Sequence, residues 1–204
     1  RQENLEGQHK AVFKASVESE QTKLGAGVNE DAGVVSFFWT KSDAVAVNTS
    51  EGFVPFALKG EGGSSKGEFE GYYNGTLGEI AVYPYSSAVT FDGSALNVAL
   101  PSQYTYSKGE THALLIAPVK GEALYFRHLA ALLKVDVAGV PEGSALVVTA
   151  PQRKINGTFA VDVSSDLPLL EAAAAQSEEQ SSVSVAFPLA ESSAEVYVPM
   201  PVGE

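Results

Sequence analysis

The chain has 204 residues, of which 45% are apolar, so it can build a large hydrophobic core and is not a wholly disordered protein. Its formal net charge of −12 repels phosphate backbones and anionic membrane surfaces, and nucleic acid is therefore not an expected partner. The sequence has no cysteine, which excludes disulfides, thiolate metal sites and cysteine nucleophiles.

The chain begins with a polar stretch, RQENLEGQHK, and we expect residues 1–10 to form a flexible segment. This stretch lacks the apolar run of a signal peptide, so either the protein is cytoplasmic or the sequence is a mature or trimmed form. No apolar run elsewhere approaches the ~18 residues that a transmembrane helix needs.

Short apolar runs separated by turn residues predict β-strands in the first part of the chain. Residues 11–18 alternate, and Phe13, Ala15 and Val17 are expected to face the core. Phe37 and Trp39 fall on one face of the following run, and Trp39 is expected to be buried. Further strands are predicted at 34–39, 43–48, 53–58, 69–73, 80–83, 96–100 and 111–117.

Two turn signals refine this prediction. Pro55 lies within a predicted strand and has no amide hydrogen, so that strand should lie at an edge or carry a bulge. The pair Asn74-Gly75 predicts a type I′ hairpin directly after residues 69–73.

The stretch 124–137 marks the passage from one unit to the next. Leu133, Val135 and Val137 alternate with polar residues, which predicts a strand that opens a second sheet. Residues 126–132 would also suit one face of a helix, but length and context favour a long strand or an extended crossover. Because residues 119–122 have the chemistry of a linker, we expect one domain at 11–119 and a second at 120–204.

The remaining sequence continues the same pattern. Strands are predicted at 145–150, 158–163, 182–187 and 195–198, while 171–180 has helix propensity without an apolar stripe and suggests a short exposed helix or a loop. About a dozen short strands without long helices between them predict antiparallel β-sandwich architecture and exclude a parallel α/β fold.

No motif in the chain points to catalysis. His9, His112 and His128 lack metal-ligand spacing, and structural roles are expected for His112 and His128. We therefore expect a protein that is not an enzyme, with no catalytic, cofactor-binding or metal-binding residues.

Tyrosines gather in the middle of the chain. Tyr72, Tyr73, Tyr83 and Tyr85 are candidates for a platform on which sugar rings stack. The alternative is structural, because tyrosine also favours half-buried strand ends, where its ring and its hydroxyl meet different surroundings.

Six short segments, taken in order, resemble the Bacteroidales-type fimbrillin family, which comprises the type V pilins and related surface adhesins. They are Phe13-x-Ala15, Trp39-x-x-Ser42-Asp43-Ala44-Val45-Ala46-Val47, Phe69-x-Gly71, Ala81-Val82-Tyr83-Pro84-Tyr85, Leu100-Pro101-Ser102-Gln103, and Leu124-x-Phe126-x-His128-Leu129 with Leu132-Leu133-Lys134-Val135. The resemblance covers residues 11–137 well and the remainder loosely. Ser42 stands where the family commonly has glycine.

The resemblance implies two transthyretin-like antiparallel β-sandwich domains. Family members usually continue past the position of Glu204, so either this is a shortened member or the C-terminal strands of an incomplete second domain are missing. The resemblance also implies export as a lipoprotein, with an N-terminal lipid anchor that this chain does not contain, and display on the outer membrane. The implied role is that of a fimbrial stalk, tip, anchor or adhesin subunit.

The implied partners are other fimbrial subunits, joined by donor-strand exchange, and a ligand on a host or bacterial surface. In the family, a protease that cuts after Arg or Lys trims the N-terminus. We expect Lys23 to be the activating site, because cleavage there releases the first strand, and Lys10 to be a harmless nick. The alternative function is a glycan-binding surface module that uses the tyrosine cluster.

Overall fold

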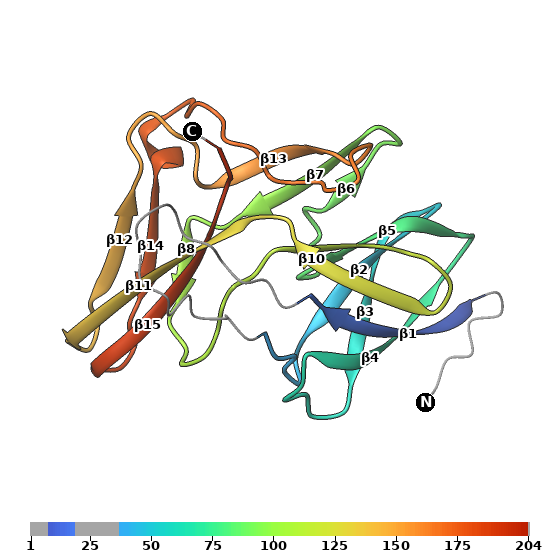
Figure 1. The fold of residues 1–204 in the computed structure, drawn as a ribbon, viewed down its shortest axis with the longest axis horizontal. Coiled ribbons are helices and arrows are strands. Elements are labelled where there is room, and N and C mark those ends of the chain that lie inside the picture. Colours follow the sequence, from blue (N-terminus) through green and yellow to red (C-terminus); the bar gives the residue numbers. More distant parts are fainter. Residues whose placement is uncertain (1–7, 19–36, 204) are drawn as a thin grey trace. The chain divides into compact units, whose positions relative to one another are not determined.

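The computed structural model describes residues 8–18 and 37–203, and Figure 1 shows them as β-strands joined by turns and loops. Within these residues the only helical segment is a single 3-10 turn, η1 (Glu178–Ser181). The all-β prediction is therefore confirmed. By contacts, the chain divides into two units: the first holds the described residues up to Ser86 together with Leu115–Arg127, and the second holds the rest.

The first unit is a closed barrel, in which the strands follow the order β1-β10-β9-β5-β2-β3-β4 and return to β1. Two facing sheets were predicted here. The barrel closes because β1 pairs antiparallel with β4 on one side and parallel with β10 on the other. Its strands are β1 (His9–Val17), β2 (Ala44–Thr49), β3 (Gly52–Lys59), β4 (Lys66–Tyr73), β5 (Leu77–Tyr83), β9 (Leu115–Pro118) and β10 (Ala123–His128).

The barrel core is built around Trp39, which is fully buried as predicted. Its ring makes edge-on contacts with Phe69 and Phe126 at centroid distances of 4.8 and 5.7 Å. Its indole N–H donates to the carbonyl of Ser65 at 3.1 Å, so the one polar atom of the ring is satisfied. Residues 37–39 do not form a strand. Their side chains still alternate between core and solvent, because Phe37 and Trp39 are buried and Phe38 is 56% exposed.

Gly75 has a φ of +69°, but Asn74 does not have the positive φ that a type I′ turn requires, so neither the predicted turn type nor the predicted hairpin is present. β4 and β5 are not neighbours, because β2 and β3 lie between them in the sheet. The connection instead crosses the end of the β2–β3 pair, where the amide of Ser50 donates to the carbonyl of Thr76 at 2.9 Å. The chain does bend at Asn74-Gly75, but the turn type and the strand pairing inferred from this dipeptide were both wrong.

Pro55 lies in β3 opposite Ala46 of β2. The ladder from β3 to β4 covers only residues 57–59, so at Pro55 the strand has a partner on one side only. This is the edge-like environment that a residue without an amide hydrogen tolerates.

The second unit contains three small sheets. They are β11 (Ala131–Val140) with β15 (Glu191–Met200), then β12 (Ala145–Thr149), β14 (Ser182–Ala186) and β8 (Gln103–Thr105), and finally β13 (Gly157–Asp162), β7 (Ala95–Leu100) and β6 (Thr90–Phe91). The first two pack as layers, because Val183 and Val185 of β14 share one core cluster with Val196 and Val198 of β15.

The predicted alternation of β11 is present. Leu133, Val135 and Val137 are half-buried, while Lys134 and Asp136 are exposed. The two strands β10 and β11 are separated by a short bend, so the stretch that could also have been helical is extended. The segment 171–180 is largely a loop and ends in η1, within the alternatives expected.

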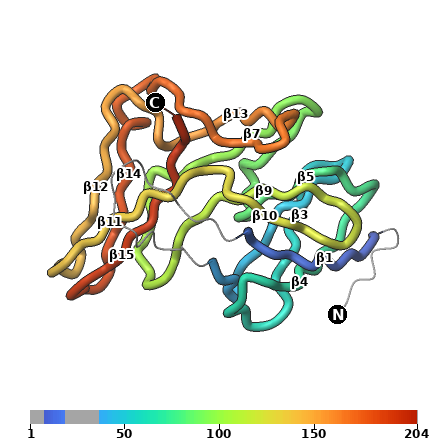
Figure 2. The backbone as a smooth tube through the Cα atoms, in the orientation of Figure 1, coloured from blue at the N-terminus to red at the C-terminus, as the bar shows by residue number. Residues whose placement is uncertain are grey.

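The domain boundary expected between residues 119 and 120 lies inside the first unit. Residues 119–122 form the tight connection from β9 to β10, which are neighbours in the barrel. Figure 2 shows the chain running through β9 and β10 before it continues into β11. The chain therefore passes from one unit to the other three times, at 86–87, 114–115 and 127–128.

His112 has an unusual backbone and a partly buried ring. Its φ is +52°, and its ring lies 4.7 Å from the ring of Tyr104. Its amide donates to Oε1 of Glu110 at 2.9 Å. Burial lowers the pKa of His112 below its ordinary value, and the nearby Glu110 carboxylate opposes this shift.

Replacing Trp39 with Ala should lower the free energy of unfolding by ~3–5 kcal/mol, because it removes a fully buried ring and the contacts around it. Urea unfolding followed by circular dichroism measures the change. Phe38→Ala is the matched control, and its effect should stay within about 0.5 kcal/mol since Phe38 is exposed. Equal losses in the two variants would contradict the burial of Trp39.

His112 should make the protein less stable in acid. Below about pH 6.5 the unfolded chain protonates this histidine while the folded chain resists, so the unfolded state binds more protons and stability falls as pH falls. His112→Asn keeps a residue that tolerates positive φ and removes the titration. The stability difference between wild type and variant should therefore shift in favour of the variant below that pH, measured by urea unfolding. A pH-independent difference would rule this out.

Candidate functional site

The strand β1 and the two strands that hold it form the candidate site. β1 pairs antiparallel with β4 from His9 opposite Tyr73 to Ser16 opposite Lys66. Its second half also pairs in parallel with β10, from Lys14 opposite Ala123 to Val17 opposite Phe126. The strand therefore fills a slot between two other strands and satisfies main-chain groups on both.

The inward side of β1 is apolar. Phe13 and Ala15 are 2% and 3% exposed, as their alternation predicted, and Val17 is half-buried. The ring of Phe13 lies 5.3 Å from the ring of Phe56 on β3. Burying these side chains provides the hydrophobic contribution that holds the strand in place.

The part of β4 that faces β1 has a small–aromatic–small pattern. Gly71, Phe69 and Gly67 lie opposite Ala11, Phe13 and Ala15. A Cβ on Gly71 would come within 2.6 Å of the Phe56 ring, and one on Gly67 within 2.6 Å of Leu58 Cδ1. Neither glycine can gain a side chain without displacing a core residue.

These glycines had no functional role in the sequence-based prediction, where Gly71 appeared only as part of a motif. Glycine inside a strand marks a close approach of backbone and side chain, and this was the signal that could have identified the slot.

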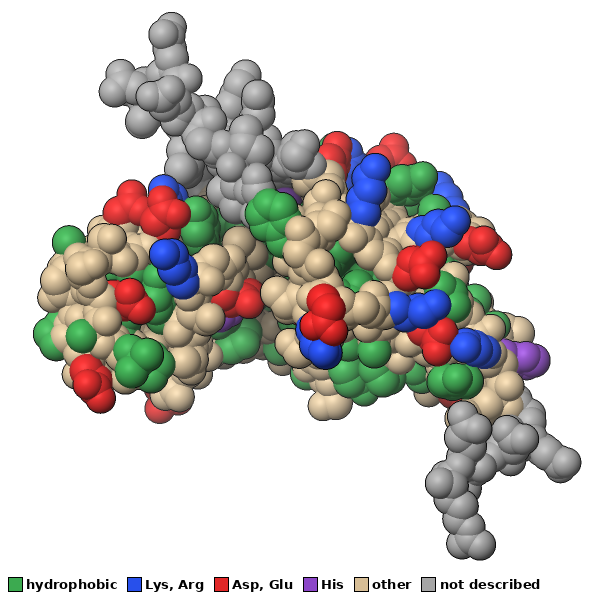
Figure 3. Space-filling view, turned by 90° about the horizontal axis from the view of Figure 1, so that it is seen from below, with side chains coloured by type: hydrophobic (Ala, Val, Ile, Leu, Met, Phe, Trp, Pro, Cys, Tyr) green, Lys and Arg blue, Asp and Glu red, His purple; other side chains and the backbone are tan. Residues whose placement is uncertain are grey.

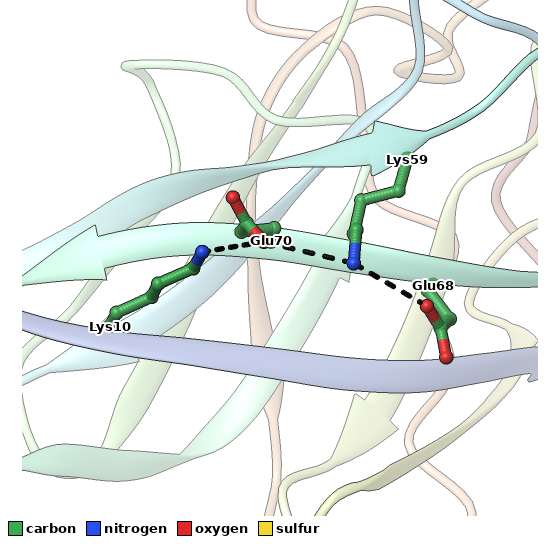
Figure 4. Close-up of polar contacts among 4 residues, drawn as sticks. All are labelled: Lys10, Lys59, Glu68 and Glu70. Atoms are coloured by element: carbon green, nitrogen blue, oxygen red, sulfur yellow. Dashed lines mark ion pairs between the residues drawn. The ribbon is translucent and has the colours of Figure 1, made fainter.

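On the outer side of the barrel, β1 is tied to its neighbours by ion pairs. Figure 4 shows Lys10 of β1 beside Glu70 of β4, with Nζ and Oε2 3.0 Å apart. Lys59 of β3 lies between Glu70 and Glu68, at 3.8 and 3.6 Å. The hydrogen bond to Glu70 raises the pKa of Lys10, but such exposed pairs stabilise a fold only slightly.

The structure corrects the environment predicted for Lys10. Residues 1–10 were expected to form one flexible segment, but β1 begins at His9, so Lys10 lies within a paired strand. Lys14 lies further inside β1, where its amide donates to the carbonyl of Glu122 at 2.8 Å. Residues 1–7 and Lys23, the candidate cleavage site, lie outside the described residues.

The four tyrosines of the candidate sugar platform do not share one surface. Tyr83 is 7% exposed, and its hydroxyl donates to Oδ1 of Asp43 at 2.9 Å. Tyr72 and Tyr73 are consecutive in β4, so their side chains point to opposite faces; Tyr72 is 52% exposed and Tyr73 lies 5.4 Å from the ring of His9. Tyr85 is 37% exposed.

The described residues offer no grouping of three or more His, Asp or Glu side chains that could bind a metal ion. They also contain no helix with the length and hydropathy of a membrane span. Figure 3 shows basic and acidic side chains interspersed on the face that it presents.

No protein-family model matches the chain, and no curated protein matches it. Among solved structures, the chain is similar to the crystal structure of a candidate cell adhesion protein from Bacteroides ovatus ATCC 8483, with a TM-score of 0.46 and 13% sequence identity. The match covers 95% of this chain and 80% of that chain. A likeness of this size carries no argument about what the chain does.

Proposed function

We propose that this protein is a non-enzymatic structural subunit of the cell surface, of the fimbrillin type, which joins a neighbouring subunit by strand addition at the slot of β1. The observation that carries the proposal is the double pairing of β1, a strand near the N-terminus, with β4 and β10. Export as a lipoprotein, outer-membrane display and a role as stalk, tip, anchor or adhesin belong to the same proposal and rest on the six sequence motifs.

Loss of β1 would leave an open slot with unpaired main-chain groups and exposed apolar side chains. Facing edges of β4 and β10 would keep unpaired amides and carbonyls, and the pocket of Phe13 and Ala15 would expose Phe56 and the neighbouring core. An extended apolar strand satisfies both needs at once, because its main chain pairs with the edges and its side chains refill the core.

The slot also sets which strand can enter. In β1 the small, large and small residues Ala11, Phe13 and Ala15 lie opposite the glycine–phenylalanine–glycine pattern of β4, and we expect an incoming strand to repeat that order at alternate positions. A shift by one residue would turn every inward side chain outward, so the register is strongly specified. A neighbouring fimbrial subunit would present such a strand.

Cleavage after Lys23 would separate the whole of β1 from the rest of the chain, since Lys23 follows the strand in sequence. Cleavage after Lys10 would leave Phe13, Ala15 and Val17 in the slot. We therefore propose Lys23 as the activating site and Lys10 as a position whose cleavage changes nothing in assembly.

Limited digestion with a trypsin-like protease tests this mechanism, with mass and oligomer size followed together. Wild type and Lys10→Gln should lose β1 and form oligomers larger than any species of the undigested chain, whereas Lys23→Gln should stay intact at that position and keep the size distribution of the undigested chain. A synthetic peptide with the sequence of residues 9–17 should block oligomer formation, and the same peptide with Phe13→Asp should not. Equal oligomer formation by wild type and Lys23→Gln, or none after β1 has been lost, would refute the mechanism.

A further inference from the structure

The outer edge of β12 presents main-chain groups that have no partner among the residues that the structure describes. β12 pairs with β14 on one side. On that side, Phe187 N–H donates to Ser144 O at 2.8 Å, and Ala150 N–H donates to Ser181 O at 2.9 Å. Because alternate residues of an antiparallel strand direct their polar groups the same way, the N–H and C=O groups of Ala145, Val147 and Thr149 point away from β14. No described residue bonds to them.

Edges of this kind are usually protected by charge, proline or shortness. The other open edges in the described part of the second unit carry such features. β6 and β8 are two and three residues long, and β11, β13 and β15 carry charged or proline residues, namely Lys134 and Asp136, Asp162, and Glu191, Glu195 and Pro199.

β12 carries none of these features. Its sequence, ALVVT, has no charge, no glycine and no proline, and it consists largely of residues that favour strands. Val147, at its centre, is 58% exposed. The strand therefore combines free hydrogen-bonding groups with an apolar, exposed side chain.

We propose that β12 is a self-association strand, and that two copies of this chain pair antiparallel along it, centred on Val147. A two-fold axis through the centre places each Val147 opposite its equivalent and each Ala145 opposite Thr149 of the second copy. All three residues direct their polar groups outward, so each opposed pair can exchange two main-chain hydrogen bonds.

The charges that flank β12 are complementary to those of a second copy. The net charge of −12 makes two molecules repel each other overall, but β12 itself is uncharged, so no like charges meet within the paired strands. Glu142 precedes the strand and Arg153 follows it, so the antiparallel arrangement brings the acidic end of one copy towards the basic end of the other. A contact of one short strand is small, so the association should be weak and dependent on concentration.

This inference does not depend on exchange of β1, and its test uses the intact, uncleaved chain. Analytical ultracentrifugation over a wide range of protein concentration should show a monomer–dimer equilibrium. Val147→Lys places two like charges opposite each other at the centre of the seam and should raise the dissociation constant ~10-fold or more. Leu189→Lys is the matched control, because Leu189 is 67% exposed between β14 and β15, and it should leave the constant unchanged.

Hydrogen exchange identifies the seam. The amides of Ala145, Val147 and Thr149 should become protected as concentration rises, while those of Leu146 and Val148 stay protected throughout because they face β14. The proposal is overturned if the chain is monomeric at every concentration, if the three edge amides never gain protection, or if Val147→Lys and Leu189→Lys change the dissociation constant equally.

Discussion

The double pairing of β1 is the constraint on which the first unit depends. The strand is bonded to β4 on one side and to β10 on the other, and without it the barrel would be an open sheet with two exposed edges. Trp39 packs edge-on against Phe69 of β4 and Phe126 of β10, so the largest side chain of the core contacts both strands that hold β1. The aromatic core and β1 thus both hold β4 and β10 together.

Local alternation was enough to predict most strands and many inward residues. Phe13 and Ala15 of β1 are buried, and so is Trp39, as their positions in the pattern indicated. The alternation of Leu133 with its neighbours correctly placed β11 in a second sheet. These predictions succeeded because burial on one face of a strand leaves a period of two in the sequence itself.

The sequence contains no comparable pattern that shows which strands pair with each other, and the predictions of strand pairing failed. The chain bends at Asn74-Gly75 without the expected type I′ geometry, and the strands on either side pair with others, because the pairing of strands depends on the whole sheet. Residues 119–122 have the composition of a linker but form a turn inside the barrel. The role of Gly67 and Gly71 in β4 was not predicted, because it depends on their close approach to Leu58 and Phe56, which come from another strand.

The seam between β1 and β10 also determines when the barrel can be completed. Glu18 and Arg127, at the end of this seam, form an ion pair at 2.8 Å although they are 109 positions apart in sequence. A chain that emerges from the ribosome can pair β1 with β4 early, but it must release all of Ser87–Leu114 before β10 appears. Closing so long a loop is entropically costly and slow. The newly made chain therefore remains unclosed, and accessible to chaperones, until late in its synthesis.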